Sequence, residues 1–120
     1  MDAKEIIGEI KNGIILPKNL VKGIDVEAYL DRRDGDKNFE KELVAAFESV
    51  QDIDSDQIEN YSELHLYIFK HIEGLIGSSE LSCYVAEDFE VILKVQQKGL
   101  SNSFVDNLLN EYMAGGLPNA

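Results

Sequence analysis

The stretch SELSCYVAEDFEVILKVQQKG, residues 79–99, decides the fold class of this protein. Its apolar side chains recur at three- and four-residue steps, the period that places them on one buried face of a helix. The residues that share this face are Leu81, Val85, Phe89, Ile92 and Val95, with Tyr84, Val91 and Leu93 beside them. Ser79 is placed to cap the first turn, and Gly99 follows the last. We therefore expect the most buried helix over 79–98, with a short strand at 89–93 as the alternative because that run is rich in strand formers.

Two amphipathic helices are expected before this stretch. Residues 37–51 carry apolar side chains at helical spacing, with charged residues opposite them. This apolar set is Phe39, Leu43, Ala46, Phe47 and Val50. The next helix ends before Gly77, and its core-facing stripe consists of Ile58, Tyr61, His65, Ile68, Ile72 and Leu75. Asp54 and Gln57 have the spacing of a capping box, which predicts where this second helix begins.

The N-terminal third predicts shorter elements. Residues 2–12 have an acidic first turn, helical spacing of isoleucines and a glycine after the end, which together predict a helix. A single helical turn is expected over 18–22, and a helix over 26–33 that the preceding aspartate caps. The apolar connector 14–16 is a second place where a short strand is the alternative, because the following proline does not continue a helix.

The C-terminal part predicts one last helix. Ser101 or Ser103 can open it, and Gly115 and Gly116 stop it before a frayed tail. Together the segments predict an all-α protein, an orthogonal bundle of about five to seven helices. With 120 residues the chain is the size of one ordinary domain, so we expect a single domain over residues 1–120.

Composition is that of an ordinary folded protein, with 44% hydrophobic and 28% charged residues. The start, MDAKE, has no basic segment followed by an apolar run, and no apolar run approaches the length that spans a bilayer. The single cysteine, Cys83, has no partner for an internal disulfide. We therefore expect a cytoplasmic protein that does not enter a membrane.

Charge is unevenly distributed along the chain, whose formal net charge is −12. Residues 1–41 hold eight Lys and Arg against nine acids, a net of −1, whereas residues 42–120 hold three against fourteen, a net of −11. Such a field repels nucleic acid and anionic lipid and attracts basic partners. A plain contribution to solubility is the alternative interpretation of the same charge.

The acidic turn DIDSDQ, which begins at Asp52, is a candidate calcium loop. Asp52, Asp54, Asp56 and Glu63 occupy positions 1, 3, 5 and 12 of a helix-loop-helix calcium site. Position 6, where the loop turns sharply and needs glycine, is Gln57. An acidic capping turn therefore competes with a calcium-responsive helix-loop-helix protein as the interpretation of this segment.

No other segment suggests a metal centre, a cofactor site or catalysis. His65 and His71 are six residues apart and lie on different faces of a helix, with His65 half-buried on the core side. Cys83 is expected to be inert packing, and the charged run DRRDGD at 31–36 is expected to be an exposed helix end. No phosphate-binding loop or nucleophile motif occurs, so we expect a protein that is not an enzyme and that needs no cofactor.

The remaining candidate is an acidic surface with tyrosines set in it. On the helix from Ser79, the side away from the core carries glutamates flanked by Tyr84 and Asp88, and the preceding helix has a second outward stripe. Carboxylates beside exposed tyrosines suit a basic protein partner. The predicted partner-binding residues are Asp52, Asp54, Asp56, Glu59, Glu63, Tyr67, Glu80, Tyr84, Glu87 and Glu90.

Size, acidity, helical pattern and the segment CYVAEDFE at 83–90 together resemble the small immunity proteins of bacterial contact-dependent growth inhibition and related toxin systems. That resemblance implies a cytoplasmic protein that binds one cognate toxin, commonly a basic nuclease, and blocks its active site or substrate groove. It transfers no individual residue role. A calcium-responsive protein and a small regulatory subunit are the alternatives from other functional classes.

Overall fold

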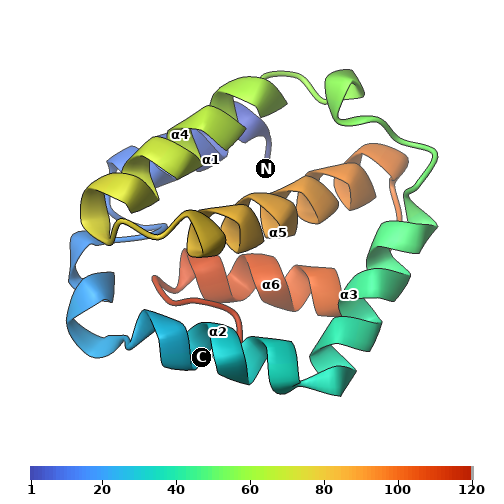
Figure 1. Cartoon of the computed structure of the whole chain (residues 1–120). Coiled ribbons are helices and arrows are strands. Elements are labelled where there is room, and N and C mark those ends of the chain that lie inside the picture. Colours follow the sequence, from blue (N-terminus) through green and yellow to red (C-terminus); the bar gives the residue numbers. More distant parts are fainter. Residues whose placement is uncertain (120) are drawn as a thin grey trace.

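Helix α5 (Ser79–Lys98) crosses the middle of the molecule, and the other helices pack around it (Figure 1). The structure, a computed structural model, describes residues 1–119, with the side chain of Val21 left out. Ten of the twenty residues of α5 are buried, among them Val91, Ile92 and Leu93. The predicted central helix is therefore confirmed, and the alternative of a strand at 89–93 is wrong.

Residues 1–119 form helices and no strand, which confirms the all-α prediction. The connector 14–16 is irregular, and its residues Ile15 and Leu16 are completely buried. The other elements are α1 (Ala3–Lys11), the 3-10 helix η1 (Lys18–Gly23), α2 (Val26–Gly35), α3 (Lys37–Ser49), the 3-10 helix η2 (Ser55–Gln57), α4 (Tyr61–Leu75) and α6 (Ser103–Met113). No helix in this described part is long and apolar enough to cross a membrane.

Helices that are far apart in the sequence lie side by side around α5. Helix α4 packs on α5 and on α1, while α6 packs on α5 from the other side (Figure 1). Helix α3 lies at one end of the molecule, where it contacts α2, α5 and α6. This arrangement places the end of α2, the whole of α3 and the first half of α5 around one region of the surface.

Polar side chains begin most of the helices. Asp25, Asp36, Ser78 and Asn102 each accept a hydrogen bond from the backbone amide three residues later, which satisfies an amide left free in the first turn. Two caps therefore differ from the prediction by one residue. Ser78 replaces Ser79 at the start of α5, and the start of α6 is capped by Asn102 rather than by either neighbouring serine.

The predicted capping box at Asp54 and Gln57 is present, but it begins the short helix η2 and not α4. The Asp54 amide donates to Oε1 of Gln57 at 2.7 Å. After η2 the chain turns at Asn60, whose φ of 62° is left-handed, and α4 starts at Tyr61. Asparagine tolerates this conformation better than most residues. The helix is therefore shorter at its N-terminus than predicted.

The buried stripe of α4 runs through Leu64 and not through His65. Leu64 is fully buried, whereas His65 is exposed. The centre of the His65 ring lies 4.8 Å from the centre of the Phe69 ring. Both positions are compatible with helical spacing from Tyr61 to Ile68, and the apolar side chain occupies the core. The prediction of a half-buried His65 is wrong for this reason.

As far as Asn119, the C-terminal tail packs against the protein, so the prediction of a frayed tail is wrong for these residues. Leu117 and Pro118 are buried, and the Tyr29 hydroxyl donates to the Pro118 carbonyl at 2.6 Å. The Asn119 amide donates to Oε2 of Glu111 at 2.9 Å. Gly115, whose φ of 85° is left-handed, turns the chain back after α6 and so allows the tail to pack in this way.

The position of Leu64 gives a stability prediction with a neighbouring control. We expect Leu64→Ala to lower the free energy of unfolding by about 2–5 kcal/mol, because it removes apolar contacts and leaves a cavity. His65→Ala, at an exposed position, should change it by about 0.5 kcal/mol or less. Urea unfolding followed by circular dichroism measures both, and equal losses for the two variants would contradict this register of α4.

Candidate functional site

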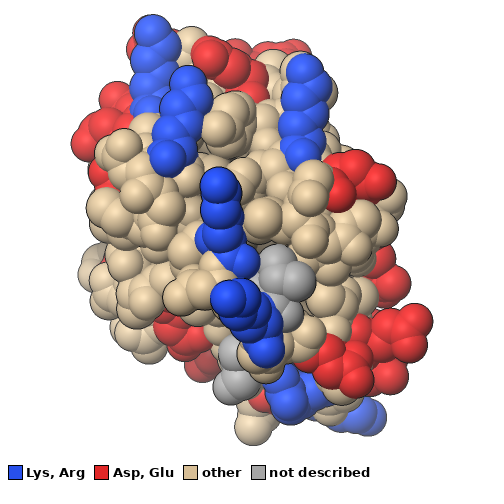
Figure 2. All heavy atoms as spheres, turned by 90° about the vertical axis from the view of Figure 1, so that its left-hand side faces the viewer, with Lys and Arg blue, Asp and Glu red and all other residues tan. Residues whose placement is uncertain are grey.

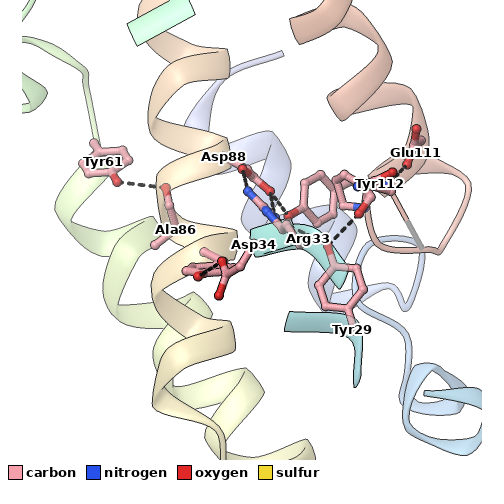
Figure 3. Close-up of polar contacts among 11 residues, drawn as sticks. Tyr29, Arg33, Asp34, Tyr61, Ala86, Asp88, Glu111 and Tyr112 are labelled. Atoms are coloured by element: carbon pink, nitrogen blue, oxygen red, sulfur yellow. Dashed lines mark hydrogen bonds and ion pairs between the residues drawn. The ribbon is translucent and has the colours of Figure 1, made fainter. Parts of the chain in front are cut away.

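A buried ion pair joins the end of α2 to the middle of α5. Arg33 donates two hydrogen bonds to Asp88, one from Nη2 to Oδ1 at 2.6 Å and one from Nη1 to Oδ2 at 2.9 Å (Figure 3). The exposed fractions of the two side chains are 5% and 0%. The prediction that the run 31–36 is wholly exposed is therefore wrong at Arg33. The placement of Asp88 beside the outward face of α5 is wrong for the same reason.

Two tyrosines complete this buried network (Figure 3). The Tyr112 hydroxyl, from α6, donates to Oδ2 of Asp88 at 2.6 Å. Nη1 of Arg33 also lies 3.4 Å from the Tyr29 hydroxyl, which in turn donates to Pro118 in the tail. No buried side-chain nitrogen or oxygen in the described part of the chain lacks a hydrogen-bond partner. The network thus connects α2, α5, α6 and the C-terminal tail.

The hydrogen bonds of the network stabilise the charges of Arg33 and Asp88 against the cost of burial. Burial lowers the pKa of the Arg33 guanidinium, while the hydrogen bonds and the charge of Asp88 raise it. The second effect is larger, so the pKa of Arg33 lies above its usual value. Burial raises the pKa of the Asp88 carboxyl, against the hydrogen bonds from Arg33 and Tyr112 that favour its carboxylate. Burial also raises the pKa of Tyr112, which therefore remains a hydroxyl donor. The arrangement suits structural support and offers no free acid or base for catalysis.

A groove opens beside the network, between the end of α2, helix α3 and the first half of α5. Its volume is about 500 Å³. The residues that line it are Arg33, Asp34, Phe39, Glu40, Leu43, Val44, Phe47, Glu48, Tyr84 and Glu87. The Arg33 guanidinium carbon lies 4.8 Å from the centre of the Phe39 ring and 4.9 Å from that of Tyr84, so the same arginine supports two walls of the groove.

Two of the predicted partner-binding residues, Tyr84 and Glu87, line this groove. The Tyr84 hydroxyl donates to Oδ1 of Asp34, and this hydrogen bond raises the pKa of Tyr84 to about 12. Glu87 is exposed, and partial burial of its carboxyl together with the nearby charge of Asp88 raises its pKa. Glu80 is exposed one turn earlier in α5 and contributes negative potential at Tyr84. These residues form one acidic group.

A second predicted group surrounds η2. Asp54 and Asp56 are exposed there, and the Ser55 hydroxyl donates to Oε1 of Glu90 at 3.3 Å. Two of the predicted carboxylates near this turn already have cationic partners. Asp52 accepts from Nζ of Lys98 at 2.8 Å, and Glu90 lies 3.3 Å from Nζ of Lys94.

The remaining predicted residues lie on or before α4. Glu59 and Glu63 are exposed, and neither is found in an ion pair within residues 1–119. Tyr67 lies instead next to α1, where Nζ of Lys11 is 5.5 Å from the centre of its ring. Figure 2 shows Lys and Arg side chains gathered over the side where η1 and the start of α2 lie. The structure therefore separates the ten predicted residues into several groups and does not gather them into one.

The oxygen ligands of the calcium alternative are not assembled in the structure. Asp52 is paired with Lys98, Asp54 caps η2, and Glu63 belongs to α4. No cluster of three His, Cys, Asp or Glu side chains that could hold a metal ion occurs among residues 1–119. Cys83 is exposed on α5, so its assignment to the packed interior is wrong.

The chain matches a known protein family over most of its length. The family model described as immunity protein PIM1 matches residues 5–119. No curated protein and no solved structure matches the chain.

The buried ion pair yields a second stability prediction. Asp88→Ala should lower the free energy of unfolding by about 3–5 kcal/mol, because it leaves the Arg33 charge buried without its partner. Asp88→Asn should cost less, since the amide oxygen still accepts from Arg33. Glu73→Ala removes an exposed carboxylate from α4 and serves as the control, with a change of about 0.5 kcal/mol or less. Chemical denaturation of the purified variants measures all three, and an Asp88→Ala variant as stable as the control would contradict the network.

Proposed function

The chain belongs to the family of immunity protein PIM1, whose model covers residues 5–119, and we propose that it protects its cell by binding a basic toxin through an acidic surface. An immunity protein acts on its cognate toxin as an inhibitor rather than as an enzyme. We further propose that the toxin is a nuclease and that it belongs to a system of contact-dependent growth inhibition. In the complex, the chain covers the active site or the substrate groove of the toxin.

Charge supports a basic partner. The net charge of −11 over residues 42–120 attracts a cationic surface and repels nucleic acid. A nuclease binds the phosphate backbone of its substrate with Lys and Arg residues, so its substrate groove is the kind of surface that this chain attracts. We infer that the chain binds no nucleic acid itself and competes with it for the toxin.

The exposed carboxylates before and on α4, and those on α5, are the proposed contact residues. Glu59, in the turn before α4, and Glu63, in the first turn of α4, have no ion-pair partner in the described chain, and a cationic partner would stabilise both. Tyr84 is half-buried and held by its hydrogen bond, which suits an anchor that contacts the toxin after electrostatic attraction has brought the two together.

We place this action in the cytoplasm, away from membranes. The exposed Cys83 remains a thiol in a reducing compartment, and the negative surface is repelled by anionic lipid headgroups. A toxin delivered into the cell would meet the immunity protein there before it reached its substrate.

Because we expect an immunity gene to lie beside the gene of its toxin, the test of the proposed function is rescue from the toxin domain encoded beside the gene for this chain. Expression of that domain alone should stop growth, and coexpression with this chain should restore it through a complex that copurifies. A nuclease assay of the purified toxin domain, with and without the chain, tests the proposed activity. Continued growth arrest in cells that accumulate folded chain would overturn the immunity function with this toxin.

Charge reversal tests the acidic surface. The combined change of Glu59, Glu63, Glu87 and Glu90 to lysine should lower the association rate constant for the toxin about tenfold or more at low salt, because it removes electrostatic steering. The matched control reverses Lys18 and Lys22, which lie in η1, and should not lower the rate. Surface plasmon resonance with inactivated toxin measures the rates after circular dichroism has verified folding. Unchanged binding by the fourfold variant would show that the surface is assigned wrongly.

A further inference from the structure

The groove beside α3 contains apolar side chains that the fold leaves uncovered. Val44 is 48% exposed, and Phe39, Leu43 and Phe47 are only half-buried. These four belong to one helix, whose inner face buries Ala46. Contiguous exposed apolar surface is uncommon on soluble monomers and typically marks an interaction site.

Carboxylates surround this apolar surface. Asp34 lies at the end of α2, Glu40 and Glu48 lie on α3, and Glu87 lies on α5, and all four are exposed. The one cation among the lining residues is Arg33, which is buried and bound to Asp88. The groove therefore presents an apolar floor inside a rim of negative charge that no lining cation balances.

Its aromatic walls are fixed before any partner arrives. Tyr84 is held by Asp34 and by the guanidinium of Arg33. Phe39 also lies against this guanidinium and makes an edge-to-face contact with Phe104, with ring centres 5.2 Å apart. Side chains that are already ordered lose little conformational entropy on binding, which favours a tight complex.

We propose that this groove is the place where the toxin docks, with a segment that inserts an apolar side chain between Val44 and Tyr84 and flanks it with Lys or Arg residues. The proposal rests on the proposed function and narrows it, because it assigns the centre of the interface to α3 and α5 and makes the carboxylates near η2 peripheral. A volume of about 500 Å³ accommodates a few side chains of one helix or loop.

Charge complementarity selects this occupant over a second copy of the chain. In a symmetric dimer through the groove, the four rim carboxylates of each copy would face those of the other across an apolar contact, which is unfavourable. The basic side of the protein and α3 lie at opposite ends of the molecule (Figure 1; Figure 2). If the groove bound the basic side of another copy, the contact would be head-to-tail and would continue into open chains of molecules.

The test uses the inactivated toxin domain encoded beside this gene and the full-length chain. Val44→Lys places a cation in the groove and should raise the dissociation constant about thirtyfold or more, the loss expected at the centre of an interface. Ile14→Lys is the matched control: Ile14 is 41% exposed, and the change adds the same charge in the connector before η1, away from the groove. Its dissociation constant should rise by about twofold at most. Val44→Ile keeps an apolar side chain and should bind like the original protein.

A second measurement keeps the result independent of variant folding. Hydrogen exchange of the unmodified chain should slow over α3 when the toxin binds, and thermal unfolding of each variant should match that of the original protein. If the original chain binds the toxin but Val44→Lys binds equally well and α3 shows no protection, the groove proposal is overturned while the proposed function stands. If the original chain does not bind the toxin, the proposed function itself fails. Sedimentation that shows a dimer abolished by Val44→Lys, with toxin binding unchanged, would assign the groove to self-association and overturn the proposal.

Discussion

Arg33 and Asp88 form an ion pair that is almost completely removed from water, and the positions of α2, α5 and α6 depend on it. Transferring two charges into a protein interior costs several kcal/mol per ion, and only good geometry with further hydrogen bonds offsets that cost. Here the carboxylate accepts twice from Arg33 and once from Tyr112. Because apolar contacts alone permit helices to slide, such directional bonds specify one relative position of the three helices, and Tyr29 extends the constraint to the tail.

The positive charge of Arg33 is used inside the protein and does not offset the negative charge of the surface. Its guanidinium neutralises Asp88 inside the protein, so it adds little positive potential at the groove above it, and no other residue that lines the groove is positively charged. The flat guanidinium also lies against Phe39 and Tyr84. One buried side chain therefore contributes to stability, to the order of the groove walls and to the sign of the charge presented to a partner.

Periodicity in the sequence predicted the helices where the apolar pattern is long and regular, as over 79–98 and 37–51. It failed where two neighbouring residues satisfy the same period, as at Leu64 and His65, because only packing decides between them. Arg32 and Arg33 illustrate the same limit: one is exposed and one buried, and the partner of Arg33 lies 55 residues away. A usable signal was present in the regular helix itself, since Asp88 occupies a position three residues after Val85 and beside Phe89, on the buried face. The residues of the groove come from three helices, and no pattern within one helix predicts how they meet.

Helix α3 shows how an amphipathic pattern relates to function. The pattern in 37–51 predicts an apolar face but contains no information on what covers that face. In the folded chain Ala46 and Val50 are buried, while Phe39, Leu43 and Phe47 remain partly open to solvent. A face that served stability alone would gain from complete burial, because each uncovered apolar side chain forgoes part of its transfer free energy. The incomplete cover of α3, set among carboxylates in a member of an immunity-protein family, is therefore better explained by a partner than by the fold of the free protein.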